Sequence, residues 1–312
     1  MAYTKEKLGE TPSELHALRV RGYRLGAELG AGAFGRVRKA FYIEEGKEAF
    51  HTQNGKEVVL AVKIIDRVRA SREFAAKFLP RELQCVERLR HPFVVRTHSI
   101  VERGSKVFVF MQYCDGGDMY RFLERLTGPL PDRHAKFWFG QLISGVKYLH
   151  EELKVCHRDL KCENLLLTRG LNVKIADYGF SRDIAEDASR TFCGSPAYCA
   201  PEILMHNAYR TPIADVWSTG VILFVMVQNS LPFSGPGVKG LTLHQLTRRM
   251  EWISPVSPVC KDLIHRILQP QPEKRISLHE VRDVYIFGRS DEAFGLPRRS
   301  REAEETNGKM AG

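Results

Sequence analysis

The sequence lacks an apolar run long enough to cross a membrane. Its most apolar stretch, residues 221–227, is far shorter than the about 20 residues that a transmembrane helix needs, and we expect it to form a buried helix. The first ten residues are polar, so no secretory signal peptide is expected. These absences predict a cytoplasmic protein without a membrane span.

Cysteine is present, but its spacing does not indicate a disulfide framework or a zinc site. The seven cysteines are odd in number and lack the paired spacings that bind zinc. Disulfides are rare in cytosolic proteins. We therefore expect reduced thiols.

Acidic residues are fewer than basic ones, 37 against 47, and the formal net charge is +10. The basic residues are spread along the chain, with small clusters at residues 19–21 and 298–301. No module combines aromatic and basic residues as nucleic-acid-binding modules do. We expect no nucleic acid partner, and the charge favours solubility and attraction to acidic partners.

Two short motifs carry most of the functional information. Residues 157–164 read His-Arg-Asp-Leu-Lys-Cys-Glu-Asn, which matches the kinase catalytic-loop pattern H-R-D-L-x-x-x-N. Residues 177–179 read Asp-Tyr-Gly, which is D-F-G with tyrosine in place of phenylalanine. Their order and spacing are those that phosphoryl transfer from ATP requires.

The residue types in these motifs fit that chemistry. A transferring phosphoryl group carries dense negative charge and needs positioning and charge neutralisation more than covalent help. Asn164 and Asp177 offer oxygen ligands to Mg²⁺. Asp159 would accept the proton of the substrate hydroxyl. The alternative is that these polar residues merely cap helices, but it does not account for both motifs.

A glycine-rich segment lies upstream, where residues 30–37 read Gly-Ala-Gly-Ala-Phe-Gly-Arg-Val. The G-x-G-x-x-G pattern also marks dinucleotide-binding folds, in which a helix begins at the glycines. Strand-like runs at residues 23–29 and 36–42 instead favour a hairpin whose backbone N–H groups approach the phosphates of ATP. Taken alone, the motif also allows a hairpin turn without a ligand.

A lysine lies inside the apolar run of residues 59–65, where an unpaired charge would be costly. Lys63 fits the strand-borne lysine of V-A-I-K. Glu82 is its expected partner, because it shares a helical face with Phe78 and Val86. The pair would orient the α- and β-phosphates of ATP. The alternative is a surface ion pair for Glu82 along its own helix.

The periodicity predicts an α+β protein of two lobes. The first lobe, residues 23–113, is expected to be an antiparallel sheet plus one helix. The second, residues 118–286, is expected to be mostly helical, and the cleft between lobes is a natural ligand site. The expected strands are residues 23–29, 36–42, 58–65, 95–101 and 106–112.

Three polar segments are expected outside this core. Residues 1–22 are expected to form an N-terminal extension, and residues 44–56 a protruding loop with a docking role left open. Residues 287–312 are expected to form a flexible tail. The tail lacks an amphipathic basic helix, which argues against a calmodulin-binding autoinhibitory segment.

Residues 23–286 resemble the catalytic domain of eukaryotic protein kinases. Within that family the chain is similar to the testis-specific serine/threonine kinases, which group near the calcium/calmodulin-dependent kinases. The resemblance implies ATP and Mg²⁺ as cofactors, protein substrates, a monomer and a role in sperm development. The segments that carry it are Lys-Phe-Leu-Pro-Arg-Glu at 77–82, Lys-Cys-Glu-Asn at 161–164, Thr-Phe-Cys-Gly-Ser at 191–195 and Ala-Pro-Glu at 200–202.

The resemblance also implies roles for residues near the base. Lys161 would neutralise the γ-phosphate during transfer, and Ser195 would contact Lys161 and Asp159. Both indicate serine or threonine as the acceptor. Thr191 falls at the family's activating phosphorylation site, modified by an upstream kinase or by autophosphorylation, and its phosphate would pair with Arg158. The alternative is an ordinary loop threonine.

Substrate preference and structural support follow from the same resemblance. Asp118 and Glu163 match positions that recognise arginine upstream of the target hydroxyl, through charge-assisted contacts. The alternative is that both are solvated surface acids. Glu202 is expected to pair with Arg275, and Asp215 to hold the backbone of the catalytic loop.

The main hypothesis is an active serine/threonine protein kinase, and the alternative is a pseudokinase or scaffold. The presence of every catalytic residue argues against the scaffold, and the peptide-type segment 177–202 argues against a kinase of small molecules. Tyr178 is not expected to abolish activity. The residues expected to bind ATP are Leu29, Gly30, Ala31, Gly32, Ala33, Phe34, Gly35, Arg36, Val37, Ala61, Lys63, Glu82, Met111 and Tyr113.

Overall fold

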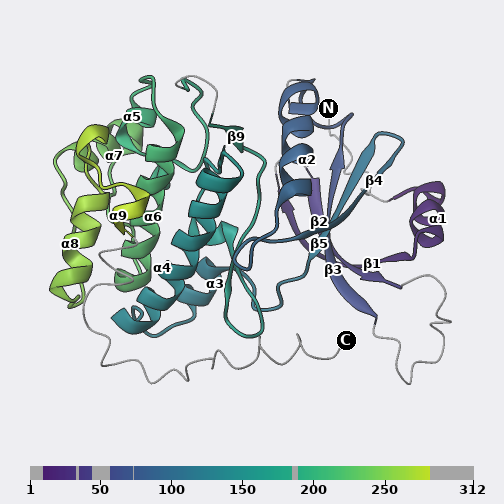
Figure 1. The fold of residues 1–312 in the computed structure, drawn as a ribbon, viewed down its shortest axis with the longest axis horizontal. Helices are drawn as coiled ribbons and strands as arrows, with labels where there is room; N and C mark the ends of the chain where they lie inside the picture. Colours follow the sequence, from purple (N-terminus) through teal and green to yellow (C-terminus); the bar gives the residue numbers. More distant parts are fainter. Residues whose placement is uncertain (1–9, 33–34, 44–56, 73, 185–188, 282–312) are drawn as a thin grey trace, which may run out of the picture.

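The computed structural model describes residues 10–32, 35–43, 57–72, 74–184 and 189–281. The chain forms two lobes, one built on a sheet and one built on helices, joined by the segment that follows β5 (Figure 1). This arrangement confirms the predicted two-lobed α+β fold.

The first lobe contains a five-stranded antiparallel sheet with strand order β1-β2-β3-β5-β4. β1 continues past the predicted end because Gly32 pairs with Gly35 across the hairpin. β4 likewise continues past residue 101, because it pairs with β5 up to the turn at Gly104, where φ is +57°. The strands are β1 (Tyr23–Gly32), β2 (Gly35–Tyr42), β3 (Val58–Asp66), β4 (Thr97–Arg103) and β5 (Lys106–Gln112).

The inner face of this sheet packs against helix α2 (Leu79–Arg88), which follows a π-helical turn, η1 (Phe74–Phe78). Cys85 and Val86 of α2 belong to the same buried cluster as Ile65 and Val109 of the sheet. Glu82 lies on this buried face of α2, as predicted.

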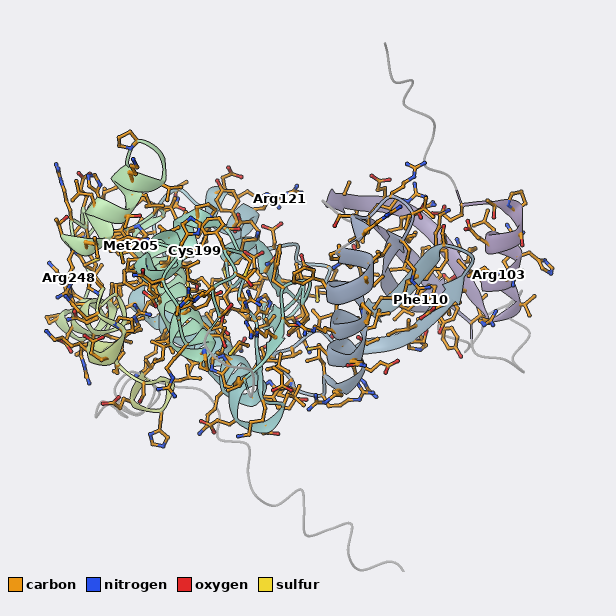
Figure 2. The ribbon with its side chains drawn as sticks, turned by 90° about the horizontal axis from the view of Figure 1, so that it is seen from above. Arg103, Phe110, Arg121, Cys199, Met205 and Arg248 are labelled. Carbon is orange, nitrogen blue, oxygen red and sulfur yellow. The ribbon has the colours of Figure 1, made fainter. Side chains whose placement is uncertain are left out.

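The outer face is covered by a second helix, α1 (Pro12–Val20), which lies within the predicted N-terminal extension and was not predicted as a helix. Leu18 is buried with Phe108 and Phe110 against this face, and Figure 2 places Phe110 inside the lobe beside α1. A capping box begins the helix: Thr11 N donates to Glu14 Oε2 at 2.7 Å, and Glu14 N donates to Thr11 Oγ1 at 3.2 Å.

The second lobe packs around helix α6 (Thr211–Gln228). By length and composition α6 could cross a membrane, but 83% of it is buried inside the protein, so it forms the centre of this lobe. Two short ladders, β6–β9 and β7–β8, follow α4 along the chain. The other helices are α3 (Met119–Glu124), α4 (Asp132–Lys147), η2 (Tyr148–Glu152), η3 (Cys162–Asn164), η4 (Pro196–Tyr198), α5 (Pro201–Leu204), α7 (Gly237–Leu246), α8 (Pro258–Ile267), η5 (Pro272–Lys274) and α9 (Leu278–Val281), and the short strands are β6 (Val155–Cys156), β7 (Leu165–Leu167), β8 (Val173–Ile175) and β9 (Arg182–Asp183).

Candidate active site

Three charged residues from different elements meet between the lobes. Lys63 Nζ of β3 lies 2.6 Å from Glu82 Oε1 of α2 and 2.9 Å from Asp177 Oδ1, which follows β8. Burial alone would lower the pKa of Lys63, but the two carboxylates outweigh it and raise the pKa. Burial would likewise raise the pKa of Asp177, and Lys63 reverses the direction and lowers it. The predicted Lys63–Glu82 pair is therefore formed.

The predicted catalytic base lies in a compact polar network. Asp159 Oδ1 accepts from Ser195 N at 2.9 Å and Ser195 Oγ at 3.1 Å. Lys161 Nζ lies 3.0 Å from Asp159 Oδ2 and donates to Ser195 Oγ at 2.8 Å. These contacts connect Asp159, Lys161 and Ser195. The three residues were predicted to act in phosphoryl transfer and to indicate serine or threonine as the acceptor.

Asn164 completes this network and leaves an oxygen for a metal ion. Its Nδ2 donates to Asp159 O at 2.8 Å and to Asp159 Oδ2 at 3.2 Å, which fixes the amide with its carbonyl oxygen on the other side. Its backbone O accepts from Ala176 N at 2.9 Å, so the catalytic loop lies beside Asp177. Asp177 Oδ1 accepts from Lys63 Nζ at 2.9 Å. Amide and carboxylate oxygens suit Mg²⁺, so the residues present fit that ion.

Asp215, on α6, accepts hydrogen bonds from the backbone of the catalytic loop. Its Oδ2 accepts from His157 N and its Oδ1 from Arg158 N, both at 2.8 Å. Arg158 has a φ of +69°, an unfavourable conformation that these bonds maintain. Burial would raise the pKa of Asp215, but its hydrogen bond with His150 and the neighbouring donors lower it. The predicted structural role of Asp215 follows from these contacts.

Tyr178 occupies the position where the motif usually has phenylalanine. Its ring is buried, with its centroid 5.0 Å from that of His157, and its hydroxyl donates to Ile175 O at 3.2 Å. Burial raises the pKa of the hydroxyl. The polar atom is therefore satisfied inside the core, and the ring packs as phenylalanine would.

The described residues of the glycine-rich hairpin form the ends of β1 and β2. A Cβ on Gly35 would lie 2.2 Å from Ile64 O, so only glycine fits there. Leu29 is 42% exposed at the start of the hairpin. The side chain of Arg36 contacts Glu10 on the outer face, so any contact of Arg36 with ATP would come from its backbone. Ala33 and Phe34, also predicted to bind ATP, lie outside the described residues.

The residues predicted to border adenine lie on paired strands or directly after them. Val37 pairs with Lys63, and Ala61 pairs with Met111, so these side chains share the inner face of the sheet. Tyr113 follows β5 in the joining segment, with Lys39 Nζ 5.2 Å from its ring. Lys39 was not among the predicted residues.

The two acids predicted to recognise arginine lie at separate positions near the catalytic loop. Asp118 caps α3, where its Oδ1 accepts from Arg121 N at 2.9 Å. Glu163 is exposed in η3. An isolated bridge between Asp118 and Leu166 keeps the start of α3 beside the strand that follows η3.

Thr191 is exposed, and its surroundings connect it to the catalytic loop. Tyr209 OH donates to Thr191 O at 3.0 Å. Arg158 Nη2 lies 3.4 Å from Tyr209 OH and 2.8 Å from Cys193 Sγ, while Arg158 Nε has no hydrogen-bond partner among the described residues. The roles of Tyr209 and Cys193 here were not predicted.

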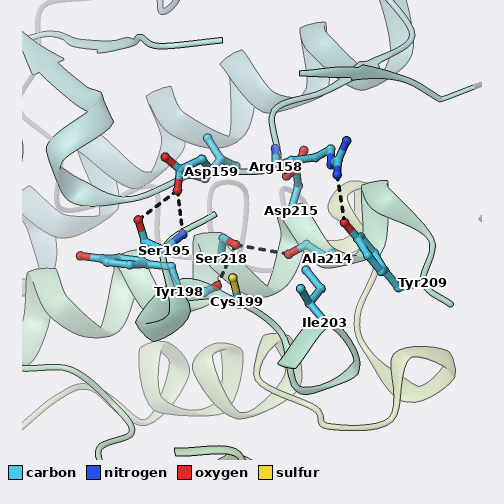
Figure 3. A pocket seen from close by; sticks show the side chains of 11 residues that line it. Arg158, Asp159, Ser195, Tyr198, Cys199, Ile203, Tyr209, Ala214, Asp215 and Ser218 are labelled. Carbon is cyan, nitrogen blue, oxygen red and sulfur yellow. Dashed lines mark hydrogen bonds between the residues drawn. The ribbon is translucent and has the colours of Figure 1, made fainter. Parts of the chain in front are cut away.

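A pocket lies behind the base rather than at the nucleotide cleft (Figure 3). Ser218 Oγ donates to Tyr198 O at 2.9 Å across it. In the same region, Arg275 forms a bidentate pair with Glu202 at 2.8 and 3.0 Å, as predicted. We assign this pocket to the packing that supports the activation segment.

The fold and this site define a protein kinase: a lysine–glutamate pair, the aspartate of the catalytic-loop motif and the aspartate of the D-F-G-like motif lie between a sheet lobe and a helical lobe. The chain belongs to the protein kinase family, because the family model "Protein kinase domain" matches residues 23–286. The curated relatives are serine/threonine-protein kinases, so the chain is a serine/threonine protein kinase.

Several relatives are testis-specific kinases. The chain is 40% identical to testis-specific serine/threonine-protein kinase 1 of Mus musculus over 273 residues, covering 85% of this chain and 71% of that one. It is 38% identical to testis-specific serine/threonine-protein kinase 3 of Homo sapiens over 265 residues, covering 83% and 94%. It is also 38% identical to CBL-interacting protein kinase 8 of Oryza sativa subsp. japonica over 293 residues, covering 93% and 61%.

Proposed function

We propose that this kinase transfers the γ-phosphate of Mg-ATP to serine or threonine hydroxyls of proteins that carry arginine upstream of the acceptor. The observation that carries the transfer step is the network of Asp159, Lys161 and Ser195. Asp159 takes the proton of the acceptor hydroxyl, and Lys161 neutralises charge on the transferring group. Lys63 positions the α- and β-phosphates, and Mg²⁺ held by Asn164 and Asp177 would neutralise phosphate charge.

The arginine preference rests on two acidic side chains near the acceptor site. Asp118 and Glu163 are the acids, and a guanidinium would form charge-assisted bonds with them. Asp118→Asn and Glu163→Gln remove the charge, and asparagine still caps α3. In a positional peptide library, each variant should lose preference for upstream arginine, whereas Asp262→Asn, at an exposed acid on α8, should keep it. Equal preference in all variants would refute this part of the proposal.

Activation by phosphorylation of Thr191 is also proposed. The side chain is exposed, so a kinase can reach it, and Arg158 Nε lacks a hydrogen-bond partner among the described residues. A phosphate on Thr191 would pair with Arg158 and order the segment next to Asp159. Thr191→Ala should lower kcat/KM by about 10-fold or more without changing the unfolding midpoint. Full activity of a folded Thr191→Ala protein would remove the switch.

The cellular role is proposed from the relatives. Several are named testis-specific kinases, which supports a role in sperm development. A monomer in the cytoplasm is proposed from the sequence alone. A catalytically silent scaffold is the second candidate function. The complete catalytic set disfavours it, and absence of phosphoryl transfer by the wild-type chain would favour it.

A further inference from the structure

One acidic side chain connects the segment ahead of β1 to the glycine-rich hairpin. Glu10 lies between two arginines of β2: Oε1 accepts from Arg36 Nη2, and Oε2 accepts from Arg38 Nη1 at 2.7 Å. The Glu10 side chain is only 3% exposed, and that of Arg36 is 14% exposed. Ion pairs shielded from water in this way are stronger than exposed ones and hold their partners in place.

The two arginines share the outer face of the sheet, because alternate residues of a strand point to the same side. Their register partners on β3 are Ile64 and Val62, which are buried in the cluster beneath α1. Val37, between the arginines, points to the opposite face and toward the nucleotide cleft. A contact on the outer face therefore restrains a strand whose inner face lines the ATP site.

The restraint acts at the end of the hairpin. Arg36 directly follows Gly35, which pairs with Gly32 at the last described position on β1. Arg38 is fixed independently, because its Nε and Nη2 donate to Gly26 O at 2.9 and 2.6 Å. Arg38 thus anchors the carboxylate of Glu10, and the carboxylate in turn holds Arg36.

We infer that Glu10 is a positioning residue for ATP: its carboxylate fixes Arg36 and thereby the backbone of β2 from Gly35 to Val37 over the phosphates. This inference rests on the proposed use of ATP at that hairpin. Loss of the carboxylate would free the hairpin to move away from the phosphates, whereas the base and the acceptor site would stay intact.

The test is steady-state kinetics of the full chain carrying Glu10→Gln. The KM for Mg-ATP should rise about 3- to 10-fold, the size expected when a residue acts on a site through one intervening contact. The kcat and the KM for the peptide should stay within about twofold of the wild-type values, because the chemistry and the peptide site are unchanged. An unchanged KM for Mg-ATP would overturn the inference.

Glu14→Gln is the matched control. Glu14 is a buried acid of the same segment whose partner, Lys106 Nζ at 2.8 Å, lies on β5 rather than on the hairpin. This variant should lower the unfolding midpoint and leave the KM for Mg-ATP unchanged. An equal rise in KM in both variants would show that Glu10 acts only through stability.

Arg36→Gln covers the case in which Glu10→Gln fails to fold. It keeps the Glu10–Arg38 pair and should raise the KM for Mg-ATP by the same factor, and no rise would again overturn the inference. The same ratios are expected for the Kd of Mg-ATP measured by calorimetry. If the wild type shows no transfer but the variants still weaken Mg-ATP binding by these factors, the proposed function is contradicted. The inference about Glu10 then still holds.

Discussion

Ser195 donates two hydrogen bonds to one oxygen of Asp159, from its backbone N at 2.9 Å and from its Oγ at 3.1 Å. The same Oγ accepts from Lys161 Nζ at 2.8 Å. The segment that carries Ser195 is therefore attached directly to Asp159, the proposed base, and to Lys161. The position of this segment and the orientation of the Asp159 carboxylate therefore depend on the same hydrogen bonds.

Loss of the Ser195 hydroxyl should therefore reduce the rate of transfer more than substrate binding. Ser195→Ala removes the contacts from Oγ and keeps the backbone bond, so kcat should fall by about 10-fold with a small change in peptide KM. Ser195→Thr keeps a hydroxyl and should retain most activity. Wild-type kcat in a folded Ser195→Ala protein would contradict this account.

Tyr178→Phe tests whether the hydroxyl in the Asp-Tyr-Gly motif contributes to stability or activity. The change removes the donor to Ile175 O and leaves the ring packing intact. The free energy of unfolding in urea should fall by about 1 kcal/mol, while kcat/KM should stay within about twofold of wild type. A large loss of activity would show that the hydroxyl has a role beyond this hydrogen bond.

The Glu202–Arg275 pair should be important for stability because it is buried. The side chains are 7% and 0% exposed, so Glu202→Gln leaves an uncompensated charge and should cost about 3–5 kcal/mol of unfolding free energy. Arg24 and Glu57 form an exposed pair, 53% and 40%, and provide the control. Arg24→Gln should cost less than about 1 kcal/mol in the same urea titration. Similar losses in both variants would contradict the role of burial.

Stability should depend on pH through Asp215. Its pKa in the folded protein lies below the ordinary 3.8, so its contribution to stability is complete above that value and is lost as pH falls through the lower folded pKa. Asp215→Asn should remove this contribution. In urea titrations at pH 6, the free energy of unfolding of the variant should therefore be lower than that of wild type. Below pH 4, it should depend less on pH than that of wild type. Parallel pH profiles for the two proteins would be inconsistent with a lowered pKa.

The residues proposed for catalysis could be predicted because Lys63, Asp159 and Asp177 lie in motifs that are contiguous in sequence, and Glu82 lies on the apolar face of a predicted helix. Lys63, Glu82, Asp159 and Asp177 were each assigned from their neighbours, and the structure brings all four to one cleft. The pairing of Lys63 with Glu82 was predictable as well. Each charge lies among apolar residues, and a buried charge is costly unless an opposite charge lies beside it.

Contacts without a local pattern were not predicted. Arg158 meets Cys193 and Tyr209, 35 and 51 positions along the chain, and no periodicity connects them. The helix α1 had a readable signal in its capping box at Thr11 and Glu14, but the partners of Glu10 depend on how that helix packs on the sheet. Tertiary packing decides such contacts.

The most direct test of the central claim is transfer of γ-phosphate from Mg-ATP to an arginine-containing serine peptide, comparing wild type with Asp159→Asn. Wild type should phosphorylate the peptide. The variant should bind ATP normally and be slower by about 100-fold or more, because it cannot take the hydroxyl proton. Equal rates in the two proteins, or no transfer by a wild type that binds ATP and carries phosphate on Thr191, would contradict a kinase that uses Asp159 as its base.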